Sequence, residues 1–146
     1  MKTAILSLCA FTVLQACAHA GIETDMPSTN RVILKSGDWK PSETETQKAL
    51  AAVGTFLVEP NLKHQNEIAK ILGNLKNYRV QFVGVTRGGR KFIWCNFFPA
   101  RGNGEDDFPY WKRQKVEVMD GGFWFWHIDF DPNTGKCMNF ASNGYA

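Results

Sequence analysis

The spacing of apolar residues along this chain changes from helical to strand-like near residue 77. Between residues 42 and 75, apolar side chains recur every three or four positions, which is typical of amphipathic helices. Ser42 and Glu45 form a capping-box signature at the start of the first helix, and Pro60 ends that helix. A second helix is predicted over residues 62–75.

Beyond residue 77, apolar and polar residues alternate, which indicates β-strands. Strands over 78–86 and 91–98 are joined by a Gly-Gly turn, because glycine supplies the positive φ that a tight hairpin needs. Further strands are predicted over 114–119, 123–131 and 136–140, with a short one within 32–39. Helices followed by a run of strands predict an α+β domain, with N-terminal helices packed on one face of a curled antiparallel sheet of four to five strands.

The predicted strand over 123–131 separates its side chains into two unlike faces. One face is entirely apolar and must be buried: Trp124, Trp126, Ile128 and Phe130. The other begins aromatic and ends polar: Phe123, Phe125, His127, Asp129 and Asp131. We therefore expect this second face to be covered at one end and solvated at the other. The preceding Gly121-Gly122 pair is expected to let the sheet bend.

The first residues are predicted to be an export signal. Lys2 supplies the positive charge, and the apolar run over 4–14 is too short to span a bilayer. Two cleavage sites remain open. Cleavage after Ala20 gives a signal peptide over 1–20, whereas cleavage before Cys17 gives a lipoprotein with a signal over 1–16 and a lipid on Cys17.

Either cleavage predicts an exported protein, located in the periplasm, attached to the outer membrane as a lipoprotein, or secreted. Residues 21–31 have the polar, proline-containing composition of a linker. Residues 32–146 are expected to form a single α+β domain, because their number suits one core.

Export would leave two cysteines, Cys95 and Cys137, in the strand-like part of the mature chain. An oxidising compartment would join them, so we predict a Cys95–Cys137 disulfide, with two buried free thiols as the alternative. The chain has no C-x-x-C motif, and His64 and His127 lack the spacing of metal ligands. We therefore predict no metal site and no cofactor.

The charge of the chain argues against two classes of partner. The formal net charge is +3, and removal of Lys2 with the signal lowers it by one. That excess is too small to indicate a nucleic-acid partner. Contact with a membrane is expected only through a lipid anchor at Cys17.

The C-terminal half resembles a group of small exported bacterial proteins. The shared positions are Tyr78-Arg79-Val80-Gln81-Phe82-Val83-Gly84-Val85, Asn96-Phe97-Phe98, Trp111-Lys112, Asp120-Gly121-Gly122 and Asn143-Gly144-Tyr145-Ala146. The order of elements also resembles the cystatin and NTF2-like folds, in which a sheet wraps around a helix. The resemblance implies export and this topology, but it implies no catalytic residue.

His127 and Asp129 are the candidates for chemistry. They lie side by side on one strand face, so they could form an acid–base pair in a sheet-lined pocket, as NTF2-like enzymes do. The alternative is a histidine and an aspartate at a solvated strand end. No nucleophile or metal-binding set accompanies them, so this second interpretation is favoured.

The long connection after residue 99 combines aromatic and basic side chains: Phe108, Tyr110, Trp111, Lys112 and Arg113. An exposed loop of this composition is typical of a protein-binding hot spot. The alternative is a loop that folds back and covers the core.

Two functions follow from these patterns. The favoured one is an exported, non-enzymatic domain that binds another macromolecule, with a protein as the suspected partner, in the manner of an inhibitor or immunity protein. The alternative is an NTF2-like small-molecule-binding protein or enzyme whose sheet-lined pocket uses His127 and Asp129.

Overall fold

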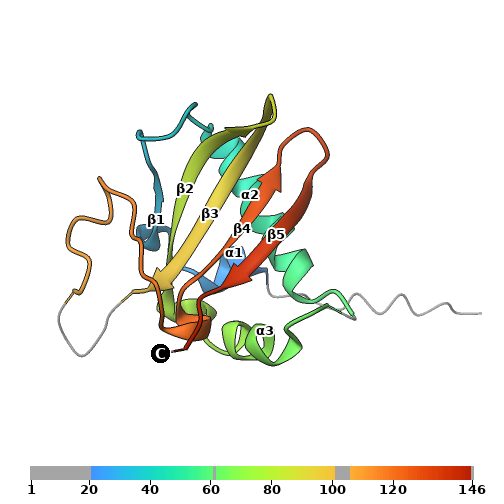
Figure 1. Ribbon diagram of the computed structural model, residues 1–146, viewed down its shortest axis with the longest axis vertical. Helices are drawn as coiled ribbons and strands as arrows, with labels where there is room; N and C mark the ends of the chain where they lie inside the picture. The colour runs from blue at the N-terminus through green and yellow to red at the C-terminus, as the bar shows by residue number, and fades with distance from the viewer. Residues whose placement is uncertain (1–20, 61, 101–105, 146) are drawn as a thin grey trace, which may run out of the picture.

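The computed structural model describes residues 21–60, 62–100 and 106–145, which form the predicted α+β fold. Five strands make one sheet in the order β1-β2-β3-β4-β5, and helix α2 (Glu43–Leu57) packs across one face of it (Figure 1). We call this face the inner face and the opposite one the outer face. The predicted signal, including Cys17, lies outside the described residues. Within the described ranges, no helix is long and apolar enough to cross a membrane.

Residues 21–31 belong to the folded domain, so the prediction of a linker is wrong. A short helix α1 (Ile22–Asp25) and the 3-10 turn η1 (Ser28–Asn30) lead into strand β1 (Arg31–Ile33). Ile22 and Met26 are each 1% exposed and belong to the main core. Two isolated apolar residues in a polar segment have no periodicity, which is why the pattern did not reveal them.

The helices follow the predicted signals closely. The Ser42 hydroxyl oxygen accepts a hydrogen bond from the Glu45 N–H, and the Glu45 carboxylate accepts one from the Ser42 N–H, so the capping box is present. Helix α3 (Gln65–Leu72) is shorter than the predicted 62–75, and the 3-10 turn η2 (Leu75–Asn77) follows it.

The central hairpin of the sheet is the predicted one. Strands β2 (Tyr78–Arg87) and β3 (Arg90–Pro99) pair antiparallel, and Gly88 and Gly89 turn between them with φ of 57° and 75°. Strand β1, however, pairs with β2 in parallel, so the sheet is mixed rather than wholly antiparallel.

Strand β4 (Trp126–Asp131) confirms the two-faced pattern but begins three residues later than predicted. Trp126, Ile128 and Phe130 are at most 3% exposed and lie in the main core. The preceding residues form the 3-10 turn η3 (Gly122–Trp124) after a glycine corner at Gly121, whose φ is 93°. Strand β5 (Lys136–Ser142) then pairs antiparallel with β4.

Residues 114–119 do not form the predicted strand. Segment 111–116 instead lies on the outer face, where it is held by the side-chain amides of Gln81 and Asn96, which are register partners on β2 and β3. We call this pair the amide clamp. Gln81 is fully buried and Asn96 is 8% exposed.

Every hydrogen bond of the amide clamp is directed at the segment or within the pair. Gln81 Nε2 donates to the carbonyls of Trp111 (2.6 Å) and Gln114 (2.7 Å). Gln81 Oε1 accepts from the Val116 N–H (2.9 Å) and from Asn96 Nδ2 (3.1 Å), which also donates to the Val116 carbonyl (2.8 Å). These bonds satisfy backbone groups that a strand ladder would otherwise have to pair.

The predicted Cys95–Cys137 disulfide is wrong, because both residues are free thiols. Cys95 is on β3 and Cys137 on β5, with β4 between them, which separates the two backbones by roughly 9–10 Å, twice the spacing of neighbouring strands. A disulfide needs Cα atoms within about 7 Å. Burial raises the pKa of Cys95, and burial with the nearby charge of Glu59 raises the pKa of Cys137 to about 12, so both thiols stay protonated.

We expect Gln81→Leu to destabilise the fold strongly. The apolar side chain leaves the Trp111 and Gln114 carbonyls and the Val116 N–H without their partner, at about 1–3 kcal/mol for each group that stays buried. Equilibrium denaturant unfolding measures the loss. Gln47→Leu is the matched control at an exposed site of α2, where the change should stay within about 0.5 kcal/mol. Equal stability of the two variants would contradict the role of the amide clamp.

Candidate functional site

The predicted aromatic loop is largely folded back onto the outer face of the sheet. Trp111 is 4% exposed and packs with Phe98 and Val116 in a second core cluster, which the partly buried Phe108 and Phe125 extend. The Arg79 guanidinium lies 4.8 Å from the centre of the Trp111 ring and forms a 2.7 Å ion pair with Asp106. Trp111 is therefore a core residue, and the prediction that it is an exposed binding anchor is wrong.

The remaining residues of the predicted hot spot have different environments. Tyr110 is 36% exposed, and Lys112 and Arg113 are exposed. The Lys112 ammonium lies 5.5 Å from the centre of the Trp111 ring, so it is drawn partly over the buried cluster. Tyr110, Lys112 and Arg113 thus remain available to a partner, whereas Phe108 contributes mainly to packing.

His127 and Asp129 share the outer face of β4, as predicted, but no hydrogen bond joins them in the described structure. Asp129 is 2% exposed, and its Oδ2 accepts hydrogen bonds from the Arg87 guanidinium and from Asn139 Nδ2 (2.9 Å). The Asp129 Oδ1 is buried and has no hydrogen-bond partner. The His127 ring lies 5.5 Å from the ring of Trp94.

Burial and nearby charges both act on His127. Burial lowers its pKa; the negative charge of Asp129 opposes this shift, and the positive charge of Arg87 adds to it. The carboxylate of Asp129 forms an ion pair with Arg87. Neither His127 nor Asp129 lines the pocket at the start of β2 or the groove on the outer face. We therefore find no arrangement at His127 and Asp129 that resembles a working acid–base pair.

A second ion pair closes the polar end of β4. Asp131 is fully buried, and its Oδ2 accepts a 2.5 Å hydrogen bond from the Arg90 guanidinium, while its Oδ1 accepts one from the Asn133 N–H (2.8 Å). Burial opposes ionisation, but the bonds from Asn133, Arg90 and Thr134 together lower the pKa of Asp131. The strand end that was expected to be solvated is therefore covered by arginine side chains.

The outer face also carries a shallow groove beside the clamped segment. It has a volume of about 410 Å³ and lies between the loop over 36–38 and the segment over 113–115. Val83 and Val85 form its floor, and Arg113 and Lys115 stand along one wall. We call it the outer groove.

The outer groove continues towards a half-buried tryptophan. Trp94 is the register partner of Val83, so the two residues are neighbours on the outer face. The Lys115 ammonium lies 5.4 Å from the centre of the Trp94 ring, and Lys115 also pairs with Glu117 at 2.6 Å. No ion pair holds Arg113 within the described part of the chain. The groove is thus an apolar strip with cationic side chains on one wall. Asp38 lies on the other wall, where its carboxylate accepts a hydrogen bond from the Thr86 N–H.

Sequence reasoning placed Arg113 in a binding surface but missed Val83, Val85 and Trp94. The alternation in β2 and β3 does assign the two valines and Trp94 to one face. What the sequence could not supply was the position of segment 111–116, because its attachment depends on two amides that are distant in the chain.

Comparisons of the chain with protein-family models, with curated proteins and with solved structures found no match.

We expect His127 to make the fold more sensitive to acid. Its folded-state pKa is lowered, so the unfolded chain binds the proton first as the pH falls below about 6.5, the ordinary histidine value. The free energy of unfolding should therefore decrease from that pH downward, until the folded-state pKa is passed.

NMR titration of His127 and denaturant unfolding across this pH range measure both effects. His127→Gln should remove part of the acid-dependent loss, and His64→Gln at an exposed position is the control for loss of a histidine. A pKa of His127 above the ordinary value would show that Asp129 dominates its environment and would contradict the expectation.

Proposed function

We propose that the protein is an exported, non-enzymatic binding domain, and that it binds an acidic segment of another protein in the outer groove. The observation that carries this proposal is an apolar floor with Arg113 and Lys115 beside it, on the sheet face that the helices leave open. Among the described residues, Lys115 has an ion-pair partner in Glu117, whereas Arg113 has none.

The chemistry of the outer groove suits a protein partner. Val85 and Trp94 offer half-buried apolar surface, and tryptophan and arginine are the residue types that most often dominate binding energy. Arg113 and Lys115 would attract a negatively charged segment and speed its encounter. Tyr110 and Lys112 precede the same wall in sequence and extend the available surface.

An enzymatic role has less support. The Asp129 carboxylate is bonded to Arg87 and Asn139, and neither His127 nor Asp129 lines the outer groove, so a substrate would not meet this pair there. Groups of three or more potential metal ligands are absent from the part of the chain that the structure describes.

Export of this domain is proposed from the N-terminal sequence, either as a lipoprotein anchored through Cys17 or after cleavage behind Ala20. In the lipoprotein form, the chain between the lipid and the folded domain would be short. Only four residues separate Cys17 from Ile22, the first buried side chain of the domain. A lipid-anchored form would therefore be held near the membrane surface.

Site-specific photo-crosslinking in the producing cells tests the proposed interaction. A photoreactive residue at Val85 should capture a discrete protein, whereas the same residue at Thr55, on the exposed side of α2, should not. Arg113→Glu with Lys115→Glu should weaken that capture at least tenfold and reverse its salt dependence, because salt screens the repulsion that replaces the attraction.

Lys48→Glu with Lys63→Glu, at exposed positions that do not line the outer groove, is the charge-matched control and should leave capture unchanged. Trp94→Ala should weaken binding by about 2 kcal/mol, roughly thirtyfold, if Trp94 is a central anchor. Equal labelling from Val85 and Thr55, or a charge reversal without effect, would contradict the proposed surface.

A further inference from the structure

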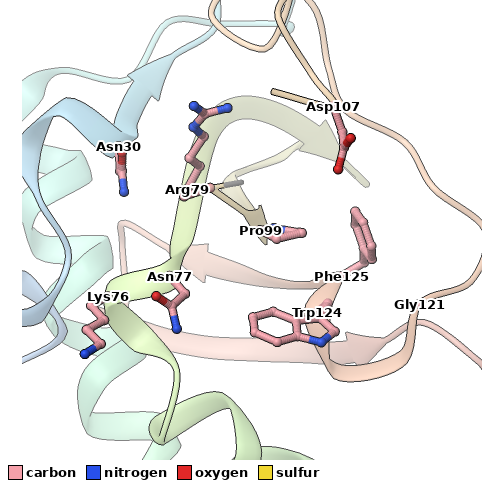
Figure 2. Close-up of a pocket in the computed structure, with 10 residues that line it drawn as sticks. Asn30, Lys76, Asn77, Arg79, Pro99, Asp107, Gly121, Trp124 and Phe125 are labelled. Atoms are coloured by element: carbon pink, nitrogen blue, oxygen red, sulfur yellow. The ribbon is translucent and has the colours of Figure 1, made fainter. Parts of the chain in front are cut away.

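A larger pocket lies at the end of the sheet where β2 begins and β3 ends (Figure 2). We call it the lower pocket. It has a volume of about 780 Å³, within the range of roughly 300–1,000 Å³ that is usual for small-molecule sites. Its walls come from four parts of the chain and include Asn77, Arg79, Pro99, Asp107, Trp124 and Phe125.

Aromatic rings form one side of the lower pocket and are held firmly in place. The Trp124 ring packs 5.7 Å from the ring of Tyr78, and the Phe125 ring packs edge-on against Phe108 at 6.0 Å. Gly121 allows the approach of Phe125, because a Cβ at this position would lie only 2.5 Å from the ring. The apolar wall is therefore preformed and does not depend on a ligand.

Both hydrogen-bond donors and hydrogen-bond acceptors surround this apolar wall. The Asp107 carboxylate points into the hollow and has no hydrogen-bond partner among the described residues (Figure 2). Asn77 donates through Nδ2 to Asn74 (3.2 Å), which leaves its Oδ1 as an acceptor. Arg79 supplies N–H donors at the opposite side. A hydroxyl group both donates and accepts, so it fits such a mixed set better than a group that does only one.

The charges around the lower pocket disfavour a strongly charged ligand. Arg79 is already paired with Asp106 at 2.7 Å, so its charge is largely compensated. Asp107 would repel an anion, while Lys76 on another wall would repel a cation. The ligand that meets all these conditions is uncharged, rich in hydroxyl groups and apolar on one face.

We infer that the lower pocket binds an uncharged pyranose sugar, with the C–H face of the ring against Trp124 and Phe125 and its hydroxyls on Asp107 and Asn77. The sugar is either free or a unit of a polysaccharide, because both present the same face and hydroxyls. The lower pocket is separate from the outer groove. If the protein binds no sugar, the proposed binding of a protein partner is therefore unaffected.

A glycan array of neutral hexoses and their oligosaccharides, followed by calorimetric titration with the best binders, tests this inference on the intact protein. We expect saturable binding of at least one neutral pyranoside. If a methyl glycoside of a single sugar binds, one sugar unit is sufficient for binding. If only oligosaccharides bind, the ligand is a unit of a longer polymer.

Asp107→Asn is the decisive variant, because Asp107 is exposed and its replacement has nearly the same shape. It should weaken sugar binding about tenfold, since a carboxylate is the stronger acceptor for a hydroxyl. Asp120→Asn makes the same change at an exposed position that does not line the pocket and should have no effect.

Trp124→Ala should abolish binding, and its thermal midpoint shows whether the variant is still folded. Two results would overturn the inference. One is the absence of saturable binding to every neutral sugar tested. The other is tighter binding of uronates or phosphate than of any neutral sugar by the unaltered protein, which would identify an anion site instead.

Discussion

The outer half of this structure depends on the hydrogen bonds that the buried amides of Gln81 and Asn96 make to one irregular segment. Segment 111–116 has no strand beside it to pair with among the described residues, and Gln81 and Asn96 are the polar side chains of the sheet that bond to it. Without Gln81, the Trp111 and Gln114 carbonyls and the Val116 N–H would lose their partner. Without Asn96, the Val116 carbonyl would lose its partner. The amide clamp therefore decides whether Trp111 can pack on Phe98, and whether Arg113 and Lys115 stand along a groove.

Ion pairs play the corresponding role at the opposite end of the sheet. Arg87 and Arg90 flank the turn between β2 and β3 and reach across to Asp129 and Asp131 on β4. The carboxylate side chains are 3% and 0% exposed, whereas the arginine side chains are 48% and 57% exposed. Loss of one arginine would leave a buried carboxylate without its counter-charge, which is costly. The acidic end of β4 is thus part of the fold rather than a reactive site.

Local signals in the sequence were sufficient for most elements of the fold. The capping box at Ser42, the glycine turn between β2 and β3 and the alternation in β4 each depend on residues that are close in the chain. The errors arose where distant residues decide the structure. Ile22 is buried because it meets α2, Cys95 and Cys137 are separated because β4 lies between their strands, and residues 114–119 are held by side chains rather than by a ladder.

In the candidate sites too, the sequence indicated what nearby residues determine and missed what distant residues determine. Alternation placed His127 and Asp129 on one face, but only the fold revealed that Arg87 and Asn139 occupy the carboxylate. Composition drew attention to the aromatic loop, yet it could not separate the buried Trp111 from the exposed Arg113. The lower pocket combines residues from four separated segments, so no local pattern could have indicated it.

Amide hydrogen exchange of Val116 tests most directly whether the amide clamp fixes segment 111–116 in the free protein. Its N–H is donated to a buried side-chain oxygen, so we predict slow exchange, with protection close to that of the β2 and β3 amides. Neighbouring exposed amides, such as that of Met119, should exchange fast in the same experiment. Rapid exchange at Val116 while β2 and β3 remain protected would show that the segment detaches without unfolding of the sheet, and would contradict a preformed outer groove.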